Sequence, residues 1–171
     1  MFEEQLQTVL NWATLNPGWS GLIVFAISLS ESLIVVGLFI PGVLAMSAIG
    51  GLVSSGALKI VPTLVWAILG AICGDGISYV IGRKFNDDLA NFWIFRKFPH
   101  WLSRGKEFFI KHGSKSIVVG RFVGPVRPFI PAVAGMMSMN PKKFFIANVV
   151  SAILWAPIYM LPGYSIFKFV Q

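Results

Sequence analysis

Two arginines stand inside an apolar stretch of the sequence and could bind an anion. Arg121 and Arg127 belong to the segment GRFVGPVRPFIPAVAG, residues 120–135. A guanidinium at membrane depth is costly unless it meets a partner or a water-filled cavity. Arginine forms strong, often two-pronged hydrogen bonds with phosphate, and broken helix ends offer free backbone amides as further donors. The segment therefore predicts a site that holds a phosphate group.

Two carboxylates in other apolar stretches could pair with these arginines. Glu31 interrupts the run 19–40, and Asp75 lies in the run 60–82. Buried ions are usually paired, and removing one partner costs about 3–5 kcal/mol. The pairs could form a purely structural, net-neutral core, or they could balance the arginines until a phosphate displaces them. Glu31 could also carry a proton, and Asp75 could simply bond a neighbouring backbone group, so the sequence leaves several roles open.

Prolines and glycines around these charges predict two breaks in the helical pattern. Proline lacks an amide donor and disfavours helix in the residue before it. Irregular backbone at membrane depth is tolerated only where it is buried in protein or lines a cavity. We therefore expect residues 22–58 and 116–139 to form re-entrant hairpins, with two ordinary crossings as the alternative for 22–58. The residues expected to shape the hairpins are Pro41, Gly42, Gly124, Pro125, Pro128, Pro131 and Gly135.

The composition is that of an integral membrane protein. Of 171 residues, 56% are hydrophobic and only 12% are charged, with a mean hydropathy of +0.74, which excludes an ordinary soluble domain. The single cysteine, Cys73, excludes an internal disulfide framework. The net charge of +7 comes mostly from residues between apolar segments, so it indicates the positive-inside rule and not a nucleic-acid partner.

The order of these segments predicts an all-α integral membrane protein with one domain over residues 1–171. Each half is expected to hold a surface helix, a re-entrant helical hairpin and a transmembrane helix. The first repeat covers about 1–82, with a surface helix over 2–16 and a crossing over 60–82. A basic amphipathic region over about 83–115 is expected on the cytoplasmic side. The second hairpin and crossing, which ends near 161, cover about 116–163.

Short matching segments indicate that the two halves are an inverted duplication. FIPAVAGM at 129–136 echoes FIPGVLAM at 39–46, and AILWAPIY at 152–159 loosely echoes AILGAICG at 67–74. Inverted repeats are typical of transporters, whose substrate sites lie near the membrane midplane at the junction of the repeats. Hairpins that enter from opposite faces would meet there, a geometry suited to alternating access or lipid passage.

The assembled residues resemble the DedA family of bacterial inner-membrane proteins, which is related to eukaryotic lipid scramblases of the VTT group. The resemblance covers about residues 31–163. It rests on Glu31, Gly37, Pro41-Gly42, Gly74-Asp75, Tyr79, Gly82-Arg83, the segment 120–135, Phe144, Asn148 and Trp155. It implies two opposed re-entrant hairpins in a multi-pass protein of the inner membrane. Glu31, Arg121 and Arg127 match positions important in that family. Many members carry an acidic residue directly after Pro-Gly, where this chain has Val43, which weakens the case for proton coupling through paired carboxylates.

Together, residues and resemblance predict a flippase or scramblase for a phosphate-bearing lipid, either a phospholipid or undecaprenyl phosphate. Its partners would be membrane lipids, with no nucleic acid, metal or cofactor, and the substrate site would comprise Glu31, Asp75, Arg121 and Arg127. An enzyme is not expected, because the apolar segments contain no histidine and Gly120 stands where the lysine of a lipid-phosphatase motif would be. Two alternatives stay open: a proton- or sodium-coupled small-solute transporter, and a non-transporting module that supports a fused or neighbouring lipid phosphatase. A homo-oligomer is also left open.

Overall fold

The computed structural model describes residues 8, 11–12, 14–38, 42–85 and 99–170 of the chain. Within these residues the chain forms α-helices and short 3₁₀ helices and contains no β-strand, so the predicted all-α class is confirmed. The surface helix predicted over 2–16 lies largely outside the described residues, and so does Pro41. The first part of the basic region, residues 86–98, also lies outside them.

Two long helices, α4 (Ile60–Phe85) and α9 (Pro141–Val170), are the only described helices long and apolar enough to cross a membrane. Both crossings were predicted, but α9 continues well past the expected end near 161, through Pro157 and Pro162. Proline removes one helical hydrogen bond, and membrane helices tolerate this loss where neighbouring groups satisfy the freed carbonyl. The outward sides of both helices expose large apolar side chains, which suits contact with lipid. These include Val61, Val65, Val80, Ile146, Ile153 and Leu161.

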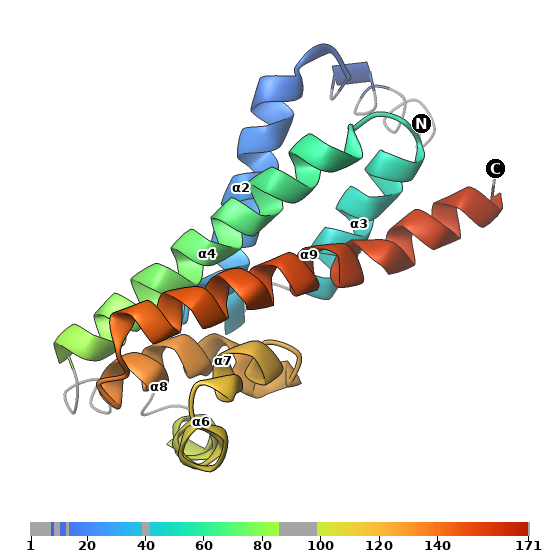
Figure 1. The fold of residues 1–171 in the computed structure, drawn as a ribbon. Helices are drawn as coiled ribbons and strands as arrows, with labels where there is room; N and C mark the ends of the chain where they lie inside the picture. The colour runs from blue at the N-terminus through green and yellow to red at the C-terminus, as the bar shows by residue number, and fades with distance from the viewer. Residues whose placement is uncertain (1–7, 9–10, 13, 39–41, 86–98, 171) are drawn as a thin grey trace.

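The first hairpin consists of α2 (Pro17–Ser32), the 3₁₀ helix η1 (Val36–Leu38) and α3 (Gly42–Ser54). In Figure 1, α2 runs from the top of the view towards α9, and α3 returns to the top. Its arms of 16 and 13 residues are about 24 and 20 Å long at the helical rise, less than the roughly 30 Å thickness of the hydrocarbon core. The geometry therefore favours the re-entrant interpretation over two ordinary crossings.

The second hairpin is built from shorter pieces. It comprises α7 (Lys115–Gly120), η3 (Gly124–Phe129) and α8 (Ile130–Met136), and the amphipathic helix α6 (Pro99–His112) packs against it. Pro125 and Pro128 lie in η3, so the predicted break in the helix is present there. Gly135, by contrast, does not shape a tip. It lies inside α8, where an added Cβ would overlap the carbonyl of Tyr79 on α4.

Glycines allow the hairpins to pack closely on the long helices, as small residues do between membrane helices. On α4, a Cβ at Gly70 or Gly74 would overlap backbone carbonyls of α2, those of Phe25 and Leu29. On α9, a Cβ at Gly163 would overlap the α3 backbone. Gly76, on the same helix, is different: nothing lies within 4 Å of a Cβ at that position.

The two hairpins pack on the long helices in opposite order, which is an exchange of packing partners. In the first hairpin α2 packs on α4 and α3 on α9, whereas in the second hairpin α8 packs on α4 and α7 on α9. An inverted repeat that matches α2, α3 and α4 with α7, α8 and α9 would produce this exchange. The duplication itself stays a prediction. The exchange brings the inner ends of both hairpins to the middle of α4 and α9.

Substituting Gly74 with alanine should destabilise the protein, whereas the same change at Gly76 should not. A Cβ at Gly74 would lie 2.6 Å from Leu29 O and 2.7 Å from Ser32 Cβ, and overpacking of this kind costs about 1–3 kcal/mol. Alanine at Gly76 meets no atom and gains up to about 1 kcal/mol of helix propensity. Unfolding by SDS titration in mild detergent would measure both. Equal midpoints for the two variants would contradict the close approach of α2 and α4.

Candidate functional site

The first ion pair of the site joins the two hairpins. Glu31 lies in the last turn of α2 and is 1% exposed, and Arg127 Nη1 donates a hydrogen bond to its Oε1 from η3, 96 residues away. Two glycines make room for the glutamate: a Cβ at Gly42 would overlap the Glu31 carboxyl group, and one at Gly37 would overlap its backbone carbonyl. Gly42 therefore accommodates the site directly, in addition to its place at the start of α3.

The second ion pair joins the second hairpin to both long helices. Arg121, at the end of α7 and 3% exposed, donates through Nη2 to Asp75 Oδ2 in the middle of α4. The same nitrogen lies 3.5 Å from Asn148 Oδ1 on α9. Asn148 Nδ2 in turn donates to the carbonyl of Ile72 at 3.1 Å. Asn148 thus holds α4, α9 and Arg121 in register.

Trp155 of α9 connects the two ion pairs. Its fully buried indole ring has its centroid 5.5 Å from Arg121 Cζ and 5.0 Å from Arg127 Cζ. Tyr159, one turn further along α9, lies 5.6 Å from Arg127 Cζ and 5.5 Å from Trp155 between ring centroids. Cations over aromatic faces are attracted by the ring quadrupole, more strongly when they are desolvated. Both arginines therefore make a cation–π contact with the ring of Trp155.

Several buried polar atoms in this region have no hydrogen-bond partner within the described residues. They are Glu31 Oε2, Ser32 Oγ, Arg121 Nη1, Arg127 Nη2 and Trp155 Nε1. Folded proteins leave few buried polar groups unpaired, because each costs about 1–3 kcal/mol. Both arginines and the tryptophan thus keep a donor that no described protein group uses.

The four charged residues predicted from the sequence converge, and the structure assigns their partners. Arg121 pairs with Asp75 and Arg127 with Glu31, a choice that the sequence left open. Asn148 and Trp155 were part of the family resemblance, but no role was predicted for either. Within the described residues, no three His, Cys, Asp or Glu side chains gather in a way that could hold a metal ion.

The arrangement can be compared with known proteins. Residues 31–165 match the VTT domain, and this range contains all four charged residues. The chain belongs to the VTT-domain family. It is 37% identical to the protein DedA of Escherichia coli K12 over 151 residues, which cover 85% of this chain and 68% of that protein. It is therefore a DedA-family protein.

Other relatives of this DedA-family chain place it in the bacterial inner membrane. It is 35% identical over 153 residues to the inner membrane protein YabI of Escherichia coli K12, which covers 90% of this chain and 60% of YabI. It is 40% identical over 145 residues to the uncharacterized membrane protein BU139 of Buchnera aphidicola, with 85% and 57% covered. The chain thus spans about 57–60% of the length of these two relatives. No solved structure matches it.

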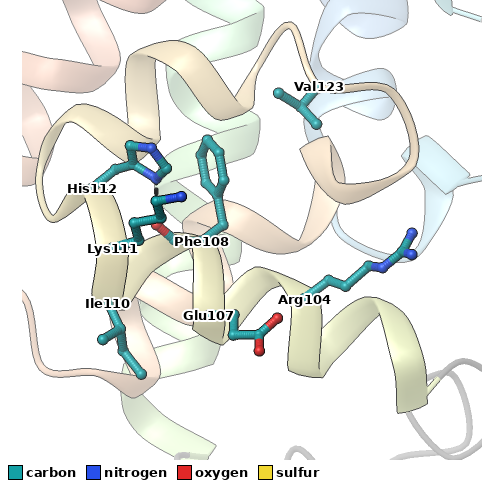
Figure 2. A pocket seen from close by; sticks show the side chains of 7 residues that line it. All are labelled: Arg104, Glu107, Phe108, Ile110, Lys111, His112 and Val123. Atoms are coloured by element: carbon teal, nitrogen blue, oxygen red, sulfur yellow. Dashed lines mark hydrogen bonds between the residues drawn. The ribbon is translucent and has the colours of Figure 1, made fainter.

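A cavity of about 710 Å³ lies away from the ion pairs of this DedA-family protein. It is lined by Arg104, Glu107, Phe108, Ile110, Lys111, His112 and Val123. Figure 2 shows that all of these except Val123 project from α6, with His112 next to Phe108, whose carbonyl lies 3.0 Å from His112 Nδ1. The helix α6 is amphipathic and rich in basic residues, which agrees with the amphipathic region predicted over about 83–115. The cavity shares no residue with the arginine site.

Proposed function

We propose that this DedA-family protein moves a phosphate-bearing lipid between membrane leaflets and holds the headgroup at Arg121 and Arg127. One observation carries the proposal. Each arginine uses one guanidinium nitrogen for a carboxylate and keeps the other, Nη1 of Arg121 and Nη2 of Arg127, buried without a partner among the described residues. Charge-assisted hydrogen bonds to phosphate are strong and suit the fork of the guanidinium. Phosphate oxygens would satisfy both nitrogens at once.

The two ion pairs make the site electrically neutral, which has consequences for binding. A phosphate beside Glu31 and Asp75 would add negative charge to a region that excludes water. Binding is therefore favourable only if a carboxylate moves away or takes a proton when the headgroup arrives. Glu31 is the better candidate for moving away, because it lies next to the turn after α2, whereas Asp75 lies in the middle of a long helix.

The headgroup would reach Arg127 before Arg121. The Arg127 side chain is 13% exposed, against 3% for Arg121. Next to Arg127, half-buried Tyr159 lies 6.2 Å from exposed Phe122 between ring centroids. The outward face of α9 is apolar near this point, at Leu154 and Ile158. The lipid chains can therefore stay in the bilayer while the headgroup enters.

A second candidate function is ion-coupled transport of a small solute through Glu31. The observation in its favour is Glu31 Oε2, which is buried without a hydrogen-bond partner among the described residues and could take up a proton. This function requires that transport follow the proton gradient. The lipid hypothesis does not require it, so an imposed gradient separates the two.

Leaflet exchange in liposomes tests the proposed function. Purified protein should accelerate the exchange of fluorescent phosphatidylglycerol, or of a polyprenyl phosphate, well above the rate in protein-free liposomes. A fluorescent glycolipid without phosphate is the matched control and should exchange at its background rate. If neither phosphate lipid is moved, with or without a proton gradient, lipid transport by this chain is wrong. Equal acceleration of the glycolipid would contradict phosphate recognition.

A further inference from the structure

Trp155 carries a buried donor next to both arginines. Its Nε1 is buried and has no hydrogen-bond partner among the described residues, although the N–H of a buried tryptophan usually finds one. Aromatic contact with the guanidiniums does not by itself require the N–H, since a phenylalanine ring also offers a π face and leaves no donor unpaired. The lone N–H belongs to the ring whose centroid lies 5.0 and 5.5 Å from the two Cζ atoms, so the three unpaired donors belong to neighbouring side chains.

We propose that Trp155 is a binding residue for the phosphate group, with its Nε1–H as the third donor beside Arg121 Nη1 and Arg127 Nη2. This inference rests on the proposed function. The ring also helps to hold the two positively charged guanidiniums near one ligand, because each of them is attracted to the same π system. The indole adds a donor without adding charge. It therefore contributes geometry and selectivity to a site whose attraction comes from the arginines.

Three donors on three side chains define the class of ligand. A phosphate group presents several oxygens at the corners of a tetrahedron, so three donors that come from different directions can each meet one. A carboxylate has about four lone-pair positions, but all of them lie in one plane, so a donor that approaches from outside that plane would be poorly satisfied. A site built to hydrogen-bond a group discriminates strongly against an analogue that leaves its donors unsatisfied. Trp155 should therefore favour a tetrahedral oxyanion over a carboxylate.

Binding of three ligands to the protein in maltoside micelles, measured by calorimetry, tests the role of Trp155. The ligands are short-chain phosphatidic acid, inorganic phosphate and decanoate. Trp155→Phe keeps an aromatic face, in a smaller ring, and removes the N–H donor. We expect this variant to bind phosphatidic acid and inorganic phosphate about tenfold more weakly, because a hydrogen bond to a charged group contributes that much or more. Its affinity for decanoate should change little. Trp66→Phe is the matched control, since Trp66 packs against Phe25 at 6.1 Å, and it should bind all three as the wild type does.

The outcomes separate this inference from the proposed function. Unchanged phosphatidic acid binding in Trp155→Phe, with loss in Arg127→Ala, would show that the indole is no donor and would leave the proposed function standing. Equal weakening of phosphatidic acid and decanoate would overturn the selectivity. If inorganic phosphate binds as tightly as phosphatidic acid, the site recognises a free anion and not a lipid headgroup. A wild type that binds neither phosphate ligand would contradict both proposals.

A measurement on the wild-type protein covers the case in which Trp155→Phe does not fold. The sequence holds six tryptophans, and phenylalanine substitutions at the other five identify the indole signal of Trp155 by elimination in ¹⁵N–¹H spectra. Added phosphatidic acid should move the Trp155 N–H proton downfield, as a new hydrogen bond does. An indole proton that does not respond at saturating ligand would overturn the inference.

Discussion

Replacement of Arg127 with alanine is expected to reduce lipid exchange about a hundredfold or more while the protein still inserts, although the loss of the counter-charge of buried Glu31 should also lower the SDS unfolding midpoint. The variant loses the donor nitrogen Nη2 and the positive charge that neutralises Glu31. A hydrogen bond to a charged group contributes about 1.5–3 kcal/mol, and each 1.4 kcal/mol is a factor of ten. The leaflet-exchange assay with phosphatidylglycerol, at equal amounts of reconstituted protein, measures the loss.

Two further variants separate binding from a general loss of charge. Arg127→Lys keeps the charge beside Glu31 but replaces the guanidinium fork with a single ammonium, so exchange should fall about tenfold while the SDS unfolding midpoint stays close to that of the wild type. Arg83→Ala removes an exposed arginine that bonds Tyr79 Oη at 2.8 Å, away from the ion pairs, and should exchange lipid normally. An Arg127→Ala protein that exchanges lipid at the wild-type rate would remove Arg127 from the site.

The charged part of the site could be predicted because charge is rare in this sequence. Glu31, Asp75, Arg121 and Arg127 stand out in apolar segments, where an ionisable group is costly and needs a reason. Their pairing could not be predicted. Arg121 and Asp75 are 46 residues apart, and Arg127 and Glu31 are 96 residues apart. The choice of partner depends on which hairpin packs on which long helix, and either assignment would have balanced the charges.

The role of the uncharged residue Trp155 could not be predicted from the sequence, because aromatic residues are common in it. Trp155 lies in an apolar helix of a chain with six tryptophans and 15 phenylalanines, where an aromatic residue gives no signal of its own. What distinguishes Trp155 is an unpaired N–H beside two arginines, which only packing reveals. Gly76 and Gly74 make the same point for the fold. They are two residues apart on α4, but only Gly74 faces α2, and their letters alone do not show which side of the helix meets a neighbour.

Replacement of Asp75 with alanine is expected to destabilise the protein by about 3–5 kcal/mol, because it leaves the buried Arg121 guanidinium without its counter-charge. The midpoint of SDS unfolding should fall accordingly. A double variant, Asp75→Leu with Arg121→Met, removes both charges together. Replacing a whole buried ion pair with apolar side chains is often neutral for stability, so the double variant should unfold close to the wild type.

Lipid exchange in the double variant then decides whether this pair is structural or also binds the ligand. If Arg121 contributes a donor to the phosphate, the double variant should be stable and at least about tenfold slower, in line with the loss of one charge-assisted hydrogen bond. A stable double variant with normal exchange would make Asp75 and Arg121 a purely structural pair and leave the headgroup to Arg127. An Asp75→Ala midpoint equal to that of the wild type would instead contradict the ion pair itself.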